Sequence, residues 1–173
     1  MKKNYLIVDA YNMIGHWPEL EKLKKMDELA DARDLLLQIL SDYYKQSGAD
    51  IIVVFDAMHV PGLTRSYQQY KLEVVWTAEG ETADSYIESL TAQLQTQFTT
   101  VTVATSDQAE QWAIFSQGAI RIPAWELYQN IKRAQKEVSQ QAKQYQAEVT
   151  VRRSPWDDGQ LEKLTDLMNH LSD

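Results

Sequence analysis

Residues 5–12 of the chain read YLIVDAYN, an aliphatic run that leads directly into an acid. A short, continuous apolar run bounded by a polar turn is typical of a strand buried on both faces, as in a parallel sheet. In open parallel sheets, ligands bind at the carboxyl ends of the strands. We therefore expect Asp9 to lie at the edge where a functional site forms, on a strand too well packed to move much.

The composition is that of one globular domain of 173 residues, with 44% hydrophobic and 24% charged residues. The absence of cysteine excludes disulfides and thiolate metal sites, and it is consistent with a reducing cytoplasm. No apolar run approaches the roughly 20 residues of a membrane helix, and the start of the chain does not have the layout of a signal peptide. We expect a soluble, cytoplasmic protein with no membrane partner and no small organic cofactor.

The net charge of −8 creates a field that repels phosphate, which argues against tight, indiscriminate binding to nucleic acid. Residues 131–153 depart from this average, because six basic residues there oppose two acids and leave a local charge of +4. The basic residues are Lys132, Arg133, Lys136, Lys143, Arg152 and Arg153. A local basic surface is thus compatible with an acidic protein.

Further strands are expected at residues 51–55, 72–76, 100–104 and 119–122. A helix is expected at 27–47, with Asp27 as N-cap and Gly48 as the left-handed residue that follows its end. A second is expected at 82–97, with Thr82 as N-cap. Further helices are expected between 107 and 118, at 124–147 after Pro123, and at 157–171. This alternation predicts an α/β fold, in which helices cover both faces of a parallel sheet. A linker at 152–155 separates a domain of residues 1–150 from a C-terminal helix within 151–173.

Four acids directly follow an expected strand or open the helix after it: Asp9, Asp56, Asp84 and Asp107. All four positions lie at one edge of a parallel sheet, where clustered carboxylates raise one another's pKa unless a cation joins them. Mg²⁺ commonly takes one or two carboxylates together with waters and substrate phosphate, and it can activate water against a phosphodiester. Asn12, one turn beyond Asp9, is placed to hydrogen-bond a metal-bound water or a phosphate.

Each of these residues also has a purely structural interpretation. An Asp after a strand is commonly a helix N-cap, Asp84 would complement a helix dipole, and Asn12 would serve as a turn residue. Other chemistries find less support, because the histidines lack metal-ligand spacing and the chain has neither a nucleophile elbow nor a glycine-rich phosphate loop. Four acids at one edge favour a metal site over four separate caps.

Two segments are candidates for RNA binding. The loop after Asp56 mixes cations with rings that can stack on unpaired bases: His59, Arg65, Tyr67, Tyr70 and Lys71. The basic run contributes Lys132, Arg133, Arg152 and Arg153. The alternatives are a solvated loop with half-buried tyrosines and an ordinary solvated helix face.

The chain resembles the NYN group of PIN-like nucleases, and most closely its bacterial YacP-like branch, at residues 9–12 (DAYN), 55–57 (FDA), 80–84 (GETAD) and 105–107 (TSD). The match runs in order from about residue 3 to residue 128. The resemblance implies a Rossmann-like, three-layer α/β/α fold with sheet order 3-2-1-4-5. It also implies a Mg²⁺- or Mn²⁺-dependent endoribonuclease that cuts mRNA on translating ribosomes.

Carried over by position, Asp9, Asp84 and Asp107 match the acidic metal site of the family, Asn12 matches its polar partner, and Asp56 matches a further recurring acid. Ala10 stands where many members have glycine, a change that removes no ligand.

Two other functions remain open. One is a catalytically inactive RNA- or ribosome-binding module on the same fold. The other is a phosphatase or receiver domain. Phosphatases of the haloacid dehalogenase type need a second Asp two residues after the nucleophile, where this chain has Tyr11. Receiver domains usually need a Lys after the fifth strand, where this chain has Pro123.

Overall fold

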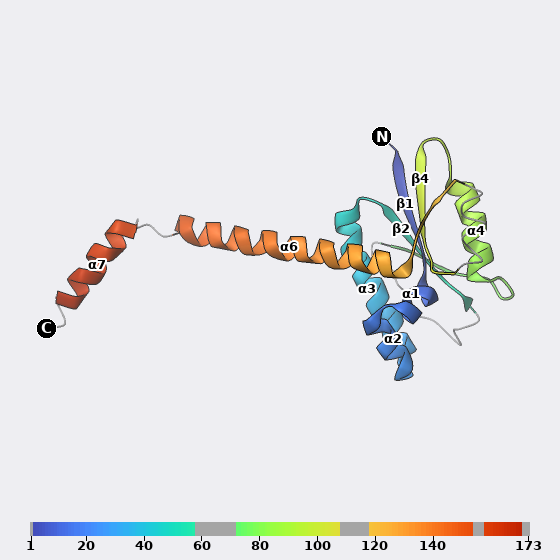
Figure 1. The fold of residues 1–173 in the computed structure, drawn as a ribbon, viewed down its shortest axis with the longest axis horizontal. Helices are drawn as coiled ribbons and strands as arrows, with labels where there is room; N and C mark the ends of the chain where they lie inside the picture. Colours follow the sequence, from blue (N-terminus) through green and yellow to red (C-terminus); the bar gives the residue numbers. More distant parts are fainter. Residues whose placement is uncertain (1, 58–71, 108–117, 154–157, 171–173) are drawn as a thin grey trace. The chain divides into compact units, whose positions relative to one another are not determined.

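A computed structural model of the chain describes residues 2–57, 72–107, 118–153 and 158–170. Within these ranges, five parallel strands form one sheet in the order β3-β2-β1-β4-β5 (Figure 1). The strands are β1 (Lys3–Asp9), β2 (Asp50–Phe55), β3 (Glu73–Trp76), β4 (Thr99–Ala104) and β5 (Ile120–Ile122). The predicted α/β fold and its strand order are therefore confirmed, and β1 is the central strand.

Helices cover both faces of the sheet. One face packs against α1 (Ala10–His16), α2 (Pro18–Lys25), α3 (Leu29–Ser47) and the first turns of α6 (Ala124–Arg153). The other face packs against α4 (Ala83–Leu94). Successive side chains of β1 alternate between the faces, because Leu6 and Val8 belong to the first core and Ile7 to the second. β1 is thus buried on both sides, as its continuous apolar run predicts.

The chain divides into two compact units, residues 1–134 and residues 135–173. The boundary lies within α6, and α7 (Asp158–His170) belongs to the second unit. The division predicted near residue 150 also falls within α6, and it stays a prediction. In the described parts of the chain, no helix combines the length and the apolar character that crossing a membrane requires.

The segment between β1 and α3, for which the sequence predicted no helix, forms the helices α1 and α2. These helices have seven and eight residues, too short for a helical period to show in the sequence. Pro18 occupies the first turn of α2, where its missing N–H leaves no hydrogen bond unmade.

The predicted N-cap at Asp27 is wrong. Asp27 has a φ of 61° and ends α2 in a left-handed turn, in which the amide of Glu28 donates to the carbonyl of Leu23 at 2.9 Å. Glu28 takes the N-cap position of α3 without a side-chain hydrogen bond. Two other predicted helix ends are confirmed, since Gly48 adopts a φ of 65° and the Thr82 hydroxyl accepts from the amide of Ser85.

Trp17 links the junction between α1 and α2 to α6. Its side chain is fully buried, and its indole Nε1–H donates to the carbonyl of Ala124 at 2.8 Å. A buried indole needs such a partner, because an unpaired N–H in the interior is costly. One residue thus joins the α1–α2 junction to the first turn of α6.

We predict that Trp17→Phe lowers the free energy of unfolding by about 1–3 kcal/mol, because the hydrogen bond to Ala124 and part of the buried volume are lost. Trp17→Ala should cost about 3–5 kcal/mol. Urea unfolding followed by circular dichroism measures both. The control is Phe98→Leu at a side chain that is 69% exposed, with an expected change within about 0.5 kcal/mol. A Trp17→Phe protein as stable as this control would contradict the account.

Candidate active site

The predicted acids come from the carboxyl ends of neighbouring parallel strands. Asp9, the last residue of β1, pairs in register with Val54 of β2, so that Asp56 follows at nearly the same level. On the other side Val8 pairs with Ala104, the last residue of β4, which places residues 105–107 at this edge as well. Asp84 stands in the first turn of α4, the helix that follows β3. The topology therefore brings all four acids to one edge of the sheet.

Asp9 is buried, with 8% of its surface exposed, and its carboxylate caps α1 by accepting from the amide of Asn12 at 3.4 Å. Burial raises the pKa of Asp9 to about 6, and the negative charges of Asp84, Asp107 and Asp56 act in the same direction. The hydrogen bond from Asn12 offsets only part of this effect. Asp9 is thus a helix N-cap, as its structural interpretation predicts, but the charges of the other three acids also raise its pKa. A carboxyl perturbed by burial and by like charges is typical of a functional site.

Asp84 and Asp107 are exposed, whereas Asp9 is not. Among the described residues, no three acidic or histidine side chains stand close enough together to hold a metal ion jointly. Mg²⁺ does not require three, because it is commonly bound by one or two carboxylates, with waters and phosphate oxygens completing its shell. The site offers one buried carboxylate, and the charges of two exposed carboxylates raise its pKa. Such donors fit a divalent cation, because they supply oxygen ligands and negative charge.

Asn12 has a structural task that sequence analysis did not foresee. Its side-chain Oδ1 accepts from the amide of Ser106 at 2.9 Å, across 94 residues of chain. The Ser106 hydroxyl accepts from the amide of Ala124 at 3.0 Å, and the Thr105 hydroxyl accepts from the amide of Asp107 at 3.1 Å. The backbone that carries Asp107 is therefore tied to both α1 and α6.

Asp56 positions the next helix. Its Oδ2 accepts from the amide of Ala83, the first residue of α4, at 3.3 Å. Glu81 accepts from the amide of Ala78 at 3.4 Å and so closes the turn before α4. Both acids stabilise the segment that presents Asp84. The ligand role expected for Asp56 stays a prediction.

The predicted RNA-binding residues are placed only in part. His59, Arg65, Tyr67, Tyr70 and Lys71 lie outside the described residues. Lys132 pairs with Glu19 at 2.7 Å, and Arg133 is exposed on α6. The backbone of Arg152 and Arg153 belongs to α6, while their side chains lie outside what the structure describes. An RNA-binding role for these residues stays a prediction.

Two arginines near this edge were not among the predicted site residues. Arg33 is buried on α3 and donates to the Tyr11 hydroxyl at 3.4 Å. Arg121 of β5 is half-buried and donates through Nε to the carbonyl of Thr105 at 3.2 Å. Each had a signal in the sequence, because Arg33 falls on the apolar stripe of its helix and Arg121 is the charged residue of an otherwise apolar strand.

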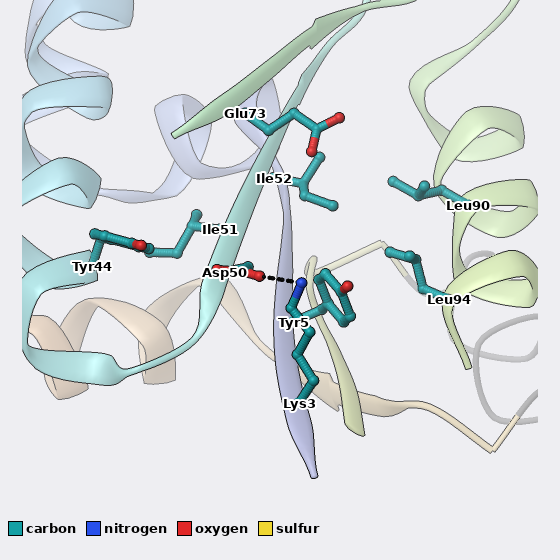
Figure 2. Close-up of a pocket in the computed structure, with 9 residues that line it drawn as sticks. All are labelled: Lys3, Tyr5, Tyr44, Asp50, Ile51, Ile52, Glu73, Leu90 and Leu94. Atoms are coloured by element: carbon teal, nitrogen blue, oxygen red, sulfur yellow. Dashed lines mark ion pairs between the residues drawn. The ribbon is translucent and has the colours of Figure 1, made fainter. Parts of the chain in front are cut away.

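A hollow of about 340 Å³ lies at the opposite edge, where β1, β2 and β3 begin (Figure 2). Leu90 and Leu94 of α4 point toward β2 across it, and Lys3 forms an ion pair with Asp50 at 2.9 Å. None of the four predicted acids lines this hollow. The acidic edge is therefore separate from it.

Comparison with known proteins agrees with this architecture. The sequence matches the YacP-like NYN domain over residues 6–169. It is 43% identical over 143 residues to the protein YacP of Bacillus subtilis (strain 168), a match that covers 83% of this chain and 84% of that protein.

Two solved structures of Rae1 (YacP) from Bacillus subtilis are also similar. One superposes with a TM-score of 0.75 at 37% identity, covering 99% of this chain and 93% of that chain. The W164L mutant superposes with a TM-score of 0.74 at 40% identity, covering 84% and 86%.

We predict that Asp9→Asn stabilises the protein at neutral and alkaline pH. The pKa of Asp9 is about 6 in the folded chain and 3.8 ordinarily, so its contribution to stability is fully present below pH 3.8 and is lost as the pH rises through 6. A neutral Asn escapes this loss. The free energy of unfolding should rise by up to about 3 kcal/mol at pH 8, and the gain should shrink toward pH 4.

Urea unfolding of the wild type and of Asp9→Asn at pH 4, 6 and 8 measures this difference. Glu88→Gln removes an exposed acid from α4 and serves as the control, with an expected change within about 0.5 kcal/mol. An Asp9→Asn protein that is less stable than the wild type at pH 8 would contradict the account.

Proposed function

This chain belongs to the YacP-like NYN domain family, and from that premise we propose that it is a Mg²⁺- or Mn²⁺-dependent endoribonuclease. One observation carries the proposal: a buried carboxylate, Asp9, whose pKa is raised by burial and by three further acids at the same edge. A divalent cation relieves such crowding, and phosphodiester hydrolysis is a reaction that such a cation promotes.

In this proposal Asp9, Asp84 and Asp107 would hold the divalent ion, and Asp56 would be an additional ligand. The bound ion would lower the pKa of water and neutralise charge on the scissile phosphate. Asp9 supplies the fixed donor, since its strand is buried on both faces. Asp84 and Asp107 are exposed, so in this proposal a substrate could reach them from solvent. Asn12 holds the backbone of Ser106 through Oδ1 and offers its amide N–H₂ to a phosphate oxygen.

We further propose that the substrate is mRNA and that translating ribosomes in the cytoplasm present it. The net charge of −8 disfavours capture of free RNA, because the field of the protein repels phosphate. A ribosome that delivers the strand removes the need for strong long-range attraction. The candidate contacts to RNA are Arg65, Tyr67, Tyr70, Lys71, Lys132, Arg133, Arg152 and Arg153.

A catalytically inactive RNA- or ribosome-binding module is the second candidate. It is favoured by the absence, among the described residues, of three acidic or histidine side chains close enough to ligate one ion. An inactive module keeps the fold and the RNA contacts but gains nothing from Mg²⁺ or Mn²⁺. Cleavage and metal binding therefore separate the two candidates.

We predict that Asp9→Asn and Asp84→Asn each reduce cleavage at least about 10- to 100-fold, because each removes a charged metal ligand. The assay incubates the protein with translating ribosomes and Mg²⁺ or Mn²⁺ and maps the mRNA ends. Glu88→Gln is the matched control, an exposed acid on α4 one turn beyond Asp84, and it should retain activity. Full activity in both Asn variants would overturn the proposed site.

We also predict that Mn²⁺ stabilises the wild type by about 2.7 kcal/mol at a concentration 100 times its dissociation constant, since the ion binds only the folded chain. Asp9→Asn should gain much less. Urea unfolding with and without Mn²⁺ measures the gain independently of RNA cleavage. Equal gains in the wild type and in Asp9→Asn would exclude Asp9 as a ligand and favour the inactive module.

A further inference from the structure

An exposed tryptophan stands on the first turn of α6, beside the acidic edge. The side chain of Trp125 is 52% exposed, although a large ring gains most from burial. One face of its indole stacks on Tyr128, with ring centroids 5.1 Å apart and planes 25° from parallel. The ring is therefore supported from one side and open to solvent on another.

The support is built from several interactions. The Tyr128 hydroxyl donates to Glu19 Oε1 at 2.9 Å. The Tyr128 ring also packs against the buried Trp17, with ring centroids 5.7 Å apart. Lys132 donates to the same Glu19 oxygen at 2.7 Å and lies over the Tyr128 ring, 5.1 Å from its centroid. These contacts limit the rotation of Tyr128, and Tyr128 in turn holds the Trp125 indole in place as a preorganised platform.

The position of this platform is fixed relative to the acids. The amide of Ala124, the residue before Trp125, donates to the Ser106 hydroxyl at 3.0 Å, and Asp107 is the next residue along that loop. The carbonyl of Ala124 accepts from Trp17 at 2.8 Å. Both backbone polar groups of Ala124 are therefore hydrogen-bonded, and the bond to Ser106 ties the start of α6 to the loop that bears Asp107.

We propose that the open face of the Trp125 indole stacks on an unpaired base of the RNA strand, next to the scissile phosphate. This inference rests on the proposed ribonuclease function and names a substrate contact of that site. Single-stranded RNA is commonly held by aromatic platforms, because every base has a π-face. Stacking also needs no positive long-range field, which suits a protein of net charge −8. The contact positions the strand without selecting a particular base.

The test compares Trp125→Leu, which removes the aromatic face, with Trp125→Phe, which keeps one. Binding of a labelled 12-nucleotide single-stranded RNA is followed by fluorescence anisotropy in EDTA, so that no metal-dependent cleavage occurs. We expect Trp125→Leu to weaken binding about tenfold and Trp125→Phe at most about threefold. The control is Phe98→Leu, at an exposed ring just before β4 on the opposite edge, and this variant should bind as the wild type does.

A second measurement identifies the stacked base. A series of the same RNA, each member lacking one base, is bound to the wild type and to Trp125→Leu. In the wild type, one abasic position should weaken binding about tenfold, and in Trp125→Leu that same position should have no effect. Binding by the wild type no tighter than by Trp125→Leu, or an abasic effect that persists in the variant, overturns the proposal.

These outcomes are independent of those for the metal site. A wild type that cuts RNA while Trp125→Leu binds normally overturns the stacking contact alone. An Asp9→Asn protein that still cuts RNA overturns the acidic site, while the binding of Trp125→Leu continues to decide the platform.

Discussion

A carboxylate at the end of a strand buried on both faces is the constraint on which this site depends. β1 lies between β2 and β4, with Ile7 and Val8 fully buried, so that Asp9 cannot move away from its neighbours. Its charge is held where water is largely excluded, and the acids at the same edge make ionisation harder still. Folding therefore fixes an unfavourable charge in place. In the proposed function, a bound divalent cation would make this arrangement favourable.

Main-chain amides set the geometry around that charge. Asn12 holds the amide of Ser106, Ser106 holds the amide of Ala124, and Asp56 holds the amide of Ala83. Each of these three bonds joins segments that are distant in the sequence. The acceptors Ser106 and Asp56 bind the first amide of a helix, and Asp9 likewise binds an amide in the first turn of α1. Hydrogen bonds to such otherwise unpaired amides are stabilising. The same polar residues thus stabilise the fold and position the exposed acids.

Sequence alone predicted the parts of the structure that depend on local pattern. The continuous apolar runs of β1 and β2 and the acids after them indicated a parallel sheet with one acidic edge. The sequence did not predict α1 and α2, because both are too short to show a helical period. It also did not predict that Asp27 adopts a left-handed conformation and ends α2 instead of capping α3. The partners of Asn12 and Asp56 lie 94 and 27 residues away. Only the assembled sheet brings such pairs together, so no local pattern reveals them.

The central claim is that the Asp9 carboxyl is perturbed by burial and by its acidic neighbours and that a divalent cation relieves the perturbation. The most direct measurement is a carbon-13 NMR titration of this carboxyl, with and without Mg²⁺. The account predicts a pKa near 6 without the ion and a clearly lower pKa in its presence. A pKa near the ordinary 3.8 in the absence of the ion, or one that does not respond to Mg²⁺, would contradict it.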